Sequence, residues 1–136
     1  DMYARGCLIG LTRGTTREHI IRAAQESIAY QVNDLLTAMK RDTGVSLSSL
    51  SVDGGASRDS FLMQFQSDIL NRKVLVPDAE ELSGIGAAYA AGRGLGLYGD
   101  EVFTRLKRRE YAPKMCEDTR VRKYNGWKDA VKSVLK

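Results

Sequence analysis

Leu50-Ser51-Val52-Asp53-Gly54-Gly55-Ala56-Ser57 is the stretch that decides the fold of this 136-residue chain. An apolar strand is predicted to run up to its two glycines, and Ser57 is predicted to cap the helix that follows. Glycine has no Cβ, so its backbone turns sharply and lets a ligand lie against it. Such a turn also aims unpaired amides outward, where a phosphate or a ribose can accept hydrogen bonds from them. Taken alone, a Gly-Gly pair favours an ordinary tight turn over a ligand site.

One long amphipathic helix precedes this stretch. Apolar residues recur every three or four positions between residues 21 and 39, which is the spacing of one buried helix face. Thr15 and Glu18 have the spacing of a capping box and predict where the helix begins, and Gly44 predicts where it ends. The apolar segment before this helix, residues 4–11, is predicted to be extended.

Helices and strands alternate over the rest of the chain, which indicates an α/β layer architecture. Ser83 is predicted to cap a helix rich in glycine and alanine. Because glycine weakens a helix, these small residues imply close packing against another helix. The sequence predicts strands at residues 47–53 and 73–76, and helices at residues 57–71, 83–92, 100–109 and 119–136.

Composition and charge describe a folded domain with a basic end. The sequence is 43% apolar and 28% charged, which is typical of a globular domain, and it contains no recognisable membrane span or secretory signal. Residues 105–136 carry 11 Lys or Arg against 4 Asp or Glu, whereas the remaining residues carry 10 against 13. The basic end lacks the interleaved aromatics and recognisable modules of nucleic-acid-binding domains. We interpret it as a solvated helical surface and expect neither a nucleic-acid nor a membrane partner.

The cysteines and the single histidine do not have the spacing of a metal site. Cys7 and Cys116 lie far apart in the sequence, so a zinc site is not expected and both thiols are predicted to be reduced. His19 has no serine or cysteine nucleophile in a motif around it and is interpreted as a surface or capping residue.

Three aspartates follow the central strand and are candidates for a general base or a ligand contact. Asp53 is interpreted as a strand-end residue that fixes the turn through local hydrogen bonds. Asp68 is interpreted as a solvated position on an amphipathic helix. Asp59 belongs to the same turn as Gly55, so it is the one acidic side chain that we expect near a ligand.

The stretch Gly94–Gly99 has the G-x-G-x-x-G spacing of a dinucleotide-binding fingerprint. The mechanism of that fingerprint requires it to follow a strand and open a helix. Here it closes a predicted helix, so we interpret it as a glycine-rich helix end.

Seven stretches, in this order and at this spacing, resemble the C-terminal half of carbohydrate kinases of the FGGY family, and together they extend over nearly the whole chain. The resemblance implies the latter part of an actin-like, ribonuclease-H-type ATPase domain, with a mixed sheet flanked by helices. Residues 1–136 would be its nucleotide-binding part, with residues 105–136 as a helical tail. The stretches are Leu8–Gly14, His19–Ala23, Glu26–Gln31, Val52–Ala56, Phe61–Leu70, Gly86–Gly92 and Arg122–Val131.

The resemblance implies an ATP-dependent kinase that transfers the γ-phosphoryl group of Mg-ATP to a primary hydroxyl of a polyol or sugar, with glycerol as the favoured acceptor. The central stretch is similar to the adenosine motif of the family. By position, Gly54, Gly55 and Ala56 would lie against the nucleotide, and Asp59 would contact its adenine or ribose end.

Two positions depart from the family pattern. The family carries Asn where this chain has Asp59, and a carboxylate only accepts hydrogen bonds where an amide also donates them. The family has an apolar residue where this chain has Gln25, which indicates a more polar local contact.

The family's catalytic aspartate, the hairpin that holds the β- and γ-phosphates, and the polyol-binding residues all precede the part that residues 1–136 resemble. The chain begins at Asp1, and we expect it to be a fragment that is inactive alone, because phosphoryl transfer needs groups from both lobes. Mg²⁺ would be held mainly through the nucleotide and the other lobe, in a cytoplasmic homo-oligomer. The alternatives are a kinase for another sugar or polyol, a non-catalytic actin-like nucleotide-binding module, and an oligomerisation unit.

Overall fold

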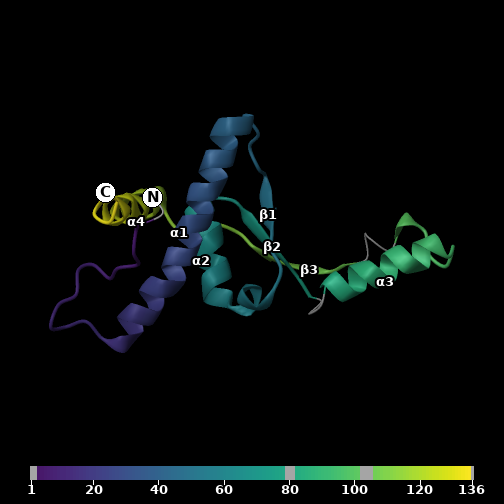
Figure 1. The fold of residues 1–136 in the computed structure, drawn as a ribbon, viewed down its shortest axis with the longest axis horizontal. Helices are drawn as coiled ribbons and strands as arrows, with labels where there is room; N and C mark the ends of the chain where they lie inside the picture. The colour runs from purple at the N-terminus through teal and green to yellow at the C-terminus, as the bar shows by residue number, and fades with distance from the viewer. Residues whose placement is uncertain (1–2, 79–81, 102–105, 136) are drawn as a thin grey trace.

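A computed structural model describes residues 3–78, 82–101 and 106–135 (Figure 1). Helices and strands alternate up to the third helix, as predicted, and a short 3-10 helix, η1, follows the central strand. In chain order the elements are α1 (Arg17–Thr43), β1 (Ser49–Ser51), η1 (Gly55–Arg58), α2 (Ser60–Leu70), β2 (Lys73–Pro77), α3 (Leu82–Gly94), β3 (Arg108–Tyr111) and α4 (Glu117–Lys132).

The three strands form one mixed sheet in the order β1-β2-β3. β1 runs parallel to β2, with Leu50 opposite Val74, and β3 runs antiparallel to β2, with Glu110 opposite Leu75. The ladder continues past β1, because the amide of Val52 donates to the carbonyl of Leu75 at 3.0 Å. The predicted α/β class, a mixed sheet flanked by helices, is confirmed.

β3 was not predicted, and the helix predicted at residues 100–109 is wrong where it reaches Arg108 and Arg109, which lie in this strand. Residues 102–105 of that prediction lie outside the described residues. The sequence of β3 is Arg-Arg-Glu-Tyr, which lacks the alternation of apolar and polar residues that marks a half-buried strand. Its position beside β2 alone makes it an edge strand, where charged residues are common.

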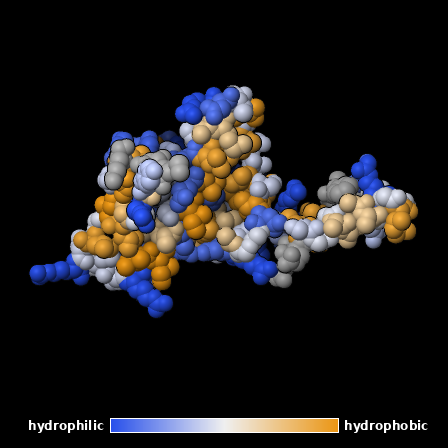
Figure 2. All heavy atoms as spheres, viewed as in Figure 1, coloured by the Kyte–Doolittle hydropathy of each residue, from blue (hydrophilic) through white to orange (hydrophobic). Residues whose placement is uncertain are grey.

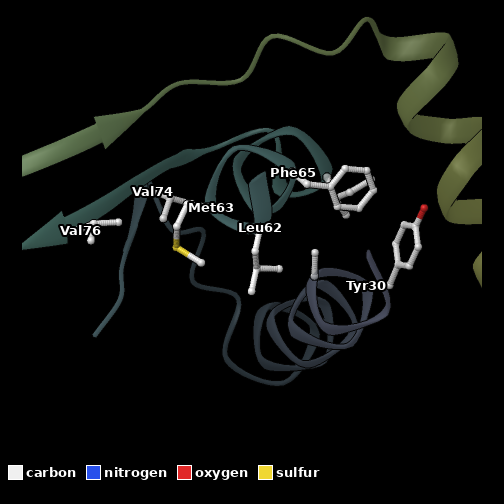
Figure 3. Packing of buried hydrophobic residues seen from close by; sticks show 8 residues of the cluster. Tyr30, Leu62, Met63, Phe65, Val74 and Val76 are labelled. Atoms are coloured by element: carbon white, nitrogen blue, oxygen red, sulfur yellow. The ribbon is translucent and has the colours of Figure 1, made fainter. Parts of the chain in front are cut away.

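The core lies where α2 packs between α1 and the sheet (Figures 1 and 3). Tyr30 of α1 meets Phe65 of α2 edge to face, with ring centroids 5.5 Å apart, and stacks on Trp127 of α4 at 5.4 Å. Edge-to-face and offset-stacked rings contribute beyond their buried area. The buried apolar residues are Ala29, Tyr30, Leu62, Met63, Phe65, Ile69, Val74 and Val76.

The N-cap of α1 lies one residue later than predicted. Thr16 is the N-cap, and its amide donates to Nδ1 of His19 at 3.1 Å. Thr15 does not cap the helix because its hydroxyl accepts from the amide of Thr12 at 2.9 Å and closes the preceding turn. The capping box of Thr15 and Glu18 is therefore wrong, whereas the capping role of His19 is confirmed. Gly44 ends the helix as predicted, with φ 71°.

α3 projects away from the core in Figure 1, and most of its described residues are exposed. It begins at Leu82, so Ser83 lies inside the helix and the prediction that it caps α3 is wrong. Within the described residues, α3 packs closely against no other helix; instead the Tyr98 ring covers Gly92. The Gly94–Gly99 stretch closes α3, as predicted.

The two ends of the chain contribute unequally to the core. Residues 4–11 have no strand partner among the described residues. α4 begins at Glu117, and its Tyr124 and Trp127 pack against the core, whereas Leu135, three residues beyond the helix, is 48% exposed. In the ranges that the structure describes, none of the helices has the length and apolar character to span a membrane.

Candidate functional site

The predicted glycine turn lies where the chain leaves β1. Gly54 has φ 90° and ψ 176°, a backbone conformation that residues other than glycine rarely adopt. Its amide donates to Oδ1 of Asp53 at 2.6 Å, which confirms that Asp53 fixes the turn through a local hydrogen bond. Residue type and conformation therefore agree at the point where the sequence predicts the ligand site.

Ser57 closes the turn and does not cap α2, so that part of the prediction is wrong. Its side chain is buried, its hydroxyl donates to the carbonyl of Gly54 at 2.7 Å, and its amide donates to the same oxygen at 3.0 Å. These two bonds draw residues 55–58 into a 3-10 helix and move the start of α2 to Ser60. A serine at this position can either cap the following helix or bond back to the preceding turn. Here the bond to the carbonyl of Gly54 decides for the turn.

The two residues between Gly54 and Ser57 expose their backbone to solvent. Gly55 and Ala56 are exposed, and their amides have no acceptor within the described residues. No atom lies within 4 Å of the place that a Cβ on Gly55 would occupy. The turn thus offers two adjacent donors and open space above them, which is the arrangement that the sequence predicts for contact with a phosphate or ribose.

Asp59 is the N-cap of α2. Its Oδ1 accepts from the amides of Phe61 at 2.9 Å and Leu62 at 3.1 Å. Its Oδ2 accepts from the side-chain amide of Gln25 on α1, which confirms the polar contact predicted at Gln25. Both carboxylate oxygens have partners within the chain, and the predicted contact of Asp59 with a nucleotide stays a prediction.

A shallow hollow of about 200 Å³ adjoins the turn at the carboxyl ends of β1 and β2. Ligands of open α/β sheets bind outside this edge of parallel strands. Its lining includes two basic residues, Arg58 and Arg109, which no motif of the sequence marked as site residues, and two acidic ones. A hydrogen bond with Tyr111, supported by the charge of Asp78, raises the pKa of Arg109. The hollow is lined by Asp53, Gly54, Ser57, Arg58, Val76, Pro77, Asp78 and Arg109.

Asp68 is not solvated, and its interpretation as an exposed helix position is wrong. The residue is 8% exposed, and its Oδ1 accepts from the amides of Lys114 at 2.6 Å and Met115 at 3.2 Å. Gln64 donates to the same oxygen at 3.1 Å. Asp68 therefore fixes the loop between β3 and α4 from the last turn of α2, whereas the glycine turn precedes the first turn of that helix. The partners lie 46 and 47 residues ahead in the sequence, so local spacing gives no sign of them.

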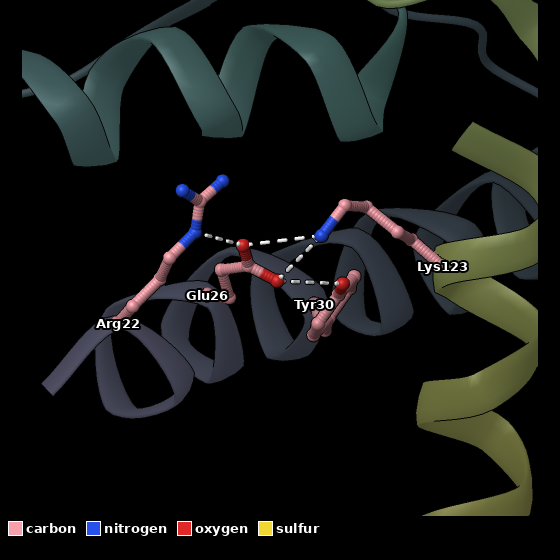
Figure 4. A network of polar contacts seen from close by, with 4 residues as sticks. All are labelled: Arg22, Glu26, Tyr30 and Lys123. Atoms are coloured by element: carbon pink, nitrogen blue, oxygen red, sulfur yellow. Dashed lines mark hydrogen bonds and ion pairs between the residues drawn. The ribbon is translucent and has the colours of Figure 1, made fainter. Parts of the chain in front are cut away.

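A second polar network joins α1 to α4 (Figure 4). Glu26 is 9% exposed, and its carboxylate lies 2.9 Å from Nε of Arg22 and 3.1 Å from Nζ of Lys123. The hydroxyl of Tyr30 donates to it at 3.2 Å. Burial and then the charge of Glu26 raise the pKa of Tyr30, so the phenol stays protonated beside the carboxylate. This network anchors α4 to α1 through a buried carboxylate.

Asp34 lies two turns further along α1 and binds α4 again. Its Oδ1 accepts from the hydroxyl of Tyr124 at 2.5 Å and its Oδ2 accepts from Nε1 of Trp127 at 2.7 Å. Burial and this hydrogen bond raise the pKa of Tyr124. Asp34 and Glu26 are structural carboxylates, so the exposed face of the glycine turn remains the best candidate site.

The surface outside the turn gives weaker indications of a site. Figure 2 shows apolar side chains gathered over the N-terminal segment and α1, where Leu8, Ile9, Leu11 and Ile28 are more than two-fifths exposed. Cys7 and Cys116 are free and exposed. The residues with defined positions contain no group of three or more His, Cys, Asp or Glu side chains arranged to hold a metal ion.

Residues 1–95 match the model of the C-terminal domain of the FGGY family of carbohydrate kinases. The glycerol kinase of Brachyspira hyodysenteriae is 59% identical over 96% of the chain, and that of Treponema denticola is 52% identical over the whole chain. The chain spans 27% and 28% of the length of these two relatives.

Solved structures resemble the fold over almost all of the chain. The crystal structure of Plasmodium falciparum glycerol kinase with ADP gives a TM-score of 0.87 at 33% identity, over 98% of this chain and 28% of that one. The xylulose kinase of Rhodospirillum rubrum gives a TM-score of 0.77 at 25% identity, over 96% of this chain and 28% of that one.

Proposed function

This chain belongs to the FGGY family of carbohydrate kinases, and from that premise we propose that it forms the adenosine-binding wall of an ATP-dependent glycerol kinase. The whole enzyme would transfer the γ-phosphoryl group of ATP to glycerol, giving glycerol 3-phosphate and ADP. One observation carries the proposal: the exposed amides of Gly55 and Ala56 have no acceptor among the described residues, in a fold that resembles a glycerol kinase crystallised with ADP.

Each residue of the turn has a distinct part in the proposed contact. Gly54 supplies the sharp bend, because its backbone conformation excludes a side chain. Gly55 leaves room for the nucleotide to approach the backbone. The amides of Gly55 and Ala56 donate to an anionic oxygen of the nucleotide, where a hydrogen bond to a charged acceptor is stronger than a neutral one. Asp59 is proposed to face the adenine or ribose end through lone pairs that its partners within the chain leave available.

Mg²⁺ would reach the site with ATP, held through the phosphates and through residues of the other lobe. Bound in this way, the ion neutralises the phosphates during transfer. The described part of residues 1–136 supplies no ligand cluster for it, so we derive no step of the reaction from the metal.

The contribution of this chain to the reaction is positioning. Phosphoryl transfer depends on holding donor and acceptor in line and on closing the site against water. A nucleotide held on this turn, through its adenosine end and a neighbouring phosphate oxygen, would present its γ-phosphate at a constant distance from that wall. The base that takes the proton from the acceptor hydroxyl would come from residues outside 1–136, and so we propose that the chain alone is inactive. Cytoplasmic location and homo-oligomeric state stay predictions.

The test is to offer a panel of polyols and sugars, with Mg-ATP, to the full-length protein that carries this chain and to measure ADP release. We expect glycerol to have the highest kcat/KM, and the 136-residue chain to give no ADP above a heat-inactivated control. A different preferred acceptor would reassign the protein to another kinase of the family. Binding of ATP with no turnover on any acceptor would instead support a non-catalytic nucleotide-binding module.

A further inference from the structure

The side chain of Gln25 reaches from α1 to the start of α2, where its Nε2 donates to Oδ2 of Asp59. The two residues lie 34 positions apart in the sequence and are both half-buried. We propose that Gln25 is a positioning residue for the adenosine turn, acting on the nucleotide through Asp59. This role rests on the proposed function and names a determinant of ATP affinity outside the turn itself.

Asp59 is connected to the turn through its backbone as well as to α1 through its side chain. Its amide donates to the carbonyl of Ala56 at 3.2 Å and closes the last turn of η1. Ala56 carries one of the two amides proposed to meet the nucleotide. Hydrogen bonds therefore connect α1 through Gln25 and Asp59 to the carbonyl of Ala56, and we expect a shift of Asp59 to move the amide of the same residue, Ala56.

The two oxygens of Asp59 have separate tasks. Oδ1 caps α2, while Oδ2 is held by Gln25 alone among the described residues. Removing the Gln25 amide leaves the cap in place, because Oδ1 keeps both backbone donors. The carboxylate then loses the one bond that holds Oδ2, and because a terminal carboxyl torsion is soft, we expect Oδ2 to turn about the anchored Oδ1. Loss of Gln25 is therefore expected to alter the orientation of the turn more than the stability of the fold.

The neutral amide of Gln25 suits this task better than a charged group. It donates one hydrogen bond to a carboxylate without neutralising the charge of Asp59. A glutamate at the same place would bring two carboxylates into contact, where they repel. The two family departures noted in the sequence, Gln25 and Asp59, thus contact each other and form one unit.

The test compares Gln25→Leu, Gln25→Glu and the control Gln31→Leu in the full-length protein, by KM for ATP, KM for glycerol, and calorimetric ATP affinity. Gln31 is also a glutamine of α1, but it is exposed. We expect Gln25→Leu to raise the KM for ATP about fivefold, with the KM for glycerol unchanged. This is less than the rise of about tenfold or more expected for a lost direct hydrogen bond to a charged group, because Gln25 acts on the nucleotide through Asp59. Gln25→Glu is expected to raise the KM for ATP further, and the control to leave it unchanged.

A double variant separates positioning from a merely structural role. Gln25→Leu with Asp59→Asn restores the apolar and amide pair of the family pattern. We therefore expect the fold loss of ATP affinity in the double variant to be smaller than the product of the fold losses in the two single variants. Multiplicative effects in the double variant, or equal changes in the KM of both substrates, would overturn the role of Gln25. A wild-type protein that neither binds ATP nor releases ADP would overturn the proposed function, and this role with it.

Discussion

Two adjacent glycines of the turn are expected to respond in opposite ways to a side chain. Gly54 has φ 90° and ψ 176°, so Gly54→Ala forces an L residue into a region that costs about 1–3 kcal/mol. Gly55 lies outside the left-handed region, and a Cβ there meets no atom within 4 Å. Gly55→Val therefore leaves the free energy of unfolding within about 0.5 kcal/mol of the wild type, as for other exposed surface substitutions.

ATP binding is expected to reverse this order of effects. A valine at position 55 occupies the open space above the two amides and separates the nucleotide from them. Loss of one hydrogen bond from these amides to a charged oxygen is worth about 1.5 kcal/mol or more, which is about a tenfold rise in the KM for ATP. The KM for glycerol is expected to stay unchanged, because the acceptor is proposed to bind in the other lobe.

The assay measures both KM values in the full-length protein at saturating concentrations of the other substrate, together with urea denaturation of each variant. Gly54→Ala provides the matched structural control, since it destabilises the same turn without filling the space above Gly55. If Gly55→Val changes both KM values equally, or changes neither, the turn is structural and does not contact the nucleotide. The same conclusion follows if Gly55→Val destabilises the protein as much as Gly54→Ala does.

Two further predictions concern the packing of α4. Asp68→Ala removes a buried acceptor of two backbone amides and is expected to destabilise the protein by about 2–4 kcal/mol in urea denaturation, whereas the exposed Asp129→Ala should change stability little. Burial and the hydrogen bond with Asp34 raise the pKa of Tyr124 above its usual value, so the stability that it contributes is complete below about pH 10 and is lost as the pH rises through the raised pKa. Tyr124→Phe should therefore lose less stability between about pH 9 and pH 11 than the wild type, and an equal loss would contradict this role.

Local sequence patterns were sufficient for the elements that depend on local interactions. The spacing of apolar residues predicted α1 and α2, and Gly44 ended α1 through its own left-handed conformation. The start of α1 was misplaced by one residue, since two adjacent threonines compete for the cap and the preceding turn claimed Thr15. β3 was missed because an edge strand of polar residues carries no periodic signal, and only its pairing with β2 makes it a strand.

In the candidate site, too, the features that depend on local sequence were predictable and those that depend on tertiary contacts were not. The glycine turn was predictable, because glycines directly after a strand allow the positive-φ conformation that a sharp turn needs, as Gly54 shows. The role of Asp59 as the cap of α2 required knowing that Ser57 folds back onto Gly54. Its contact with Gln25 depends on how α1 packs against α2, which spacing along the sequence does not encode. The prediction that Asp68 is solvated was wrong for the same reason, since its hydrogen-bond partners come from a loop beyond β3.

α1 is the element that relates the glycine turn to the C-terminal helix. Three of its polar side chains leave it toward different partners: Gln25 toward Asp59 at the start of α2, and Glu26 and Asp34 toward α4. Neighbouring positions on a helix point about 100° apart, so consecutive residues can serve two different elements. The buried carboxylate of Glu26 pairs with the ammonium group of Lys123. This ion pair offsets one of the positive charges at the C-terminal end of the chain where α4 packs against α1. α1 thus contacts both the residue that follows the turn and the C-terminal helix, and we expect the geometry of the proposed nucleotide wall to depend on a helix that contributes no atom to it.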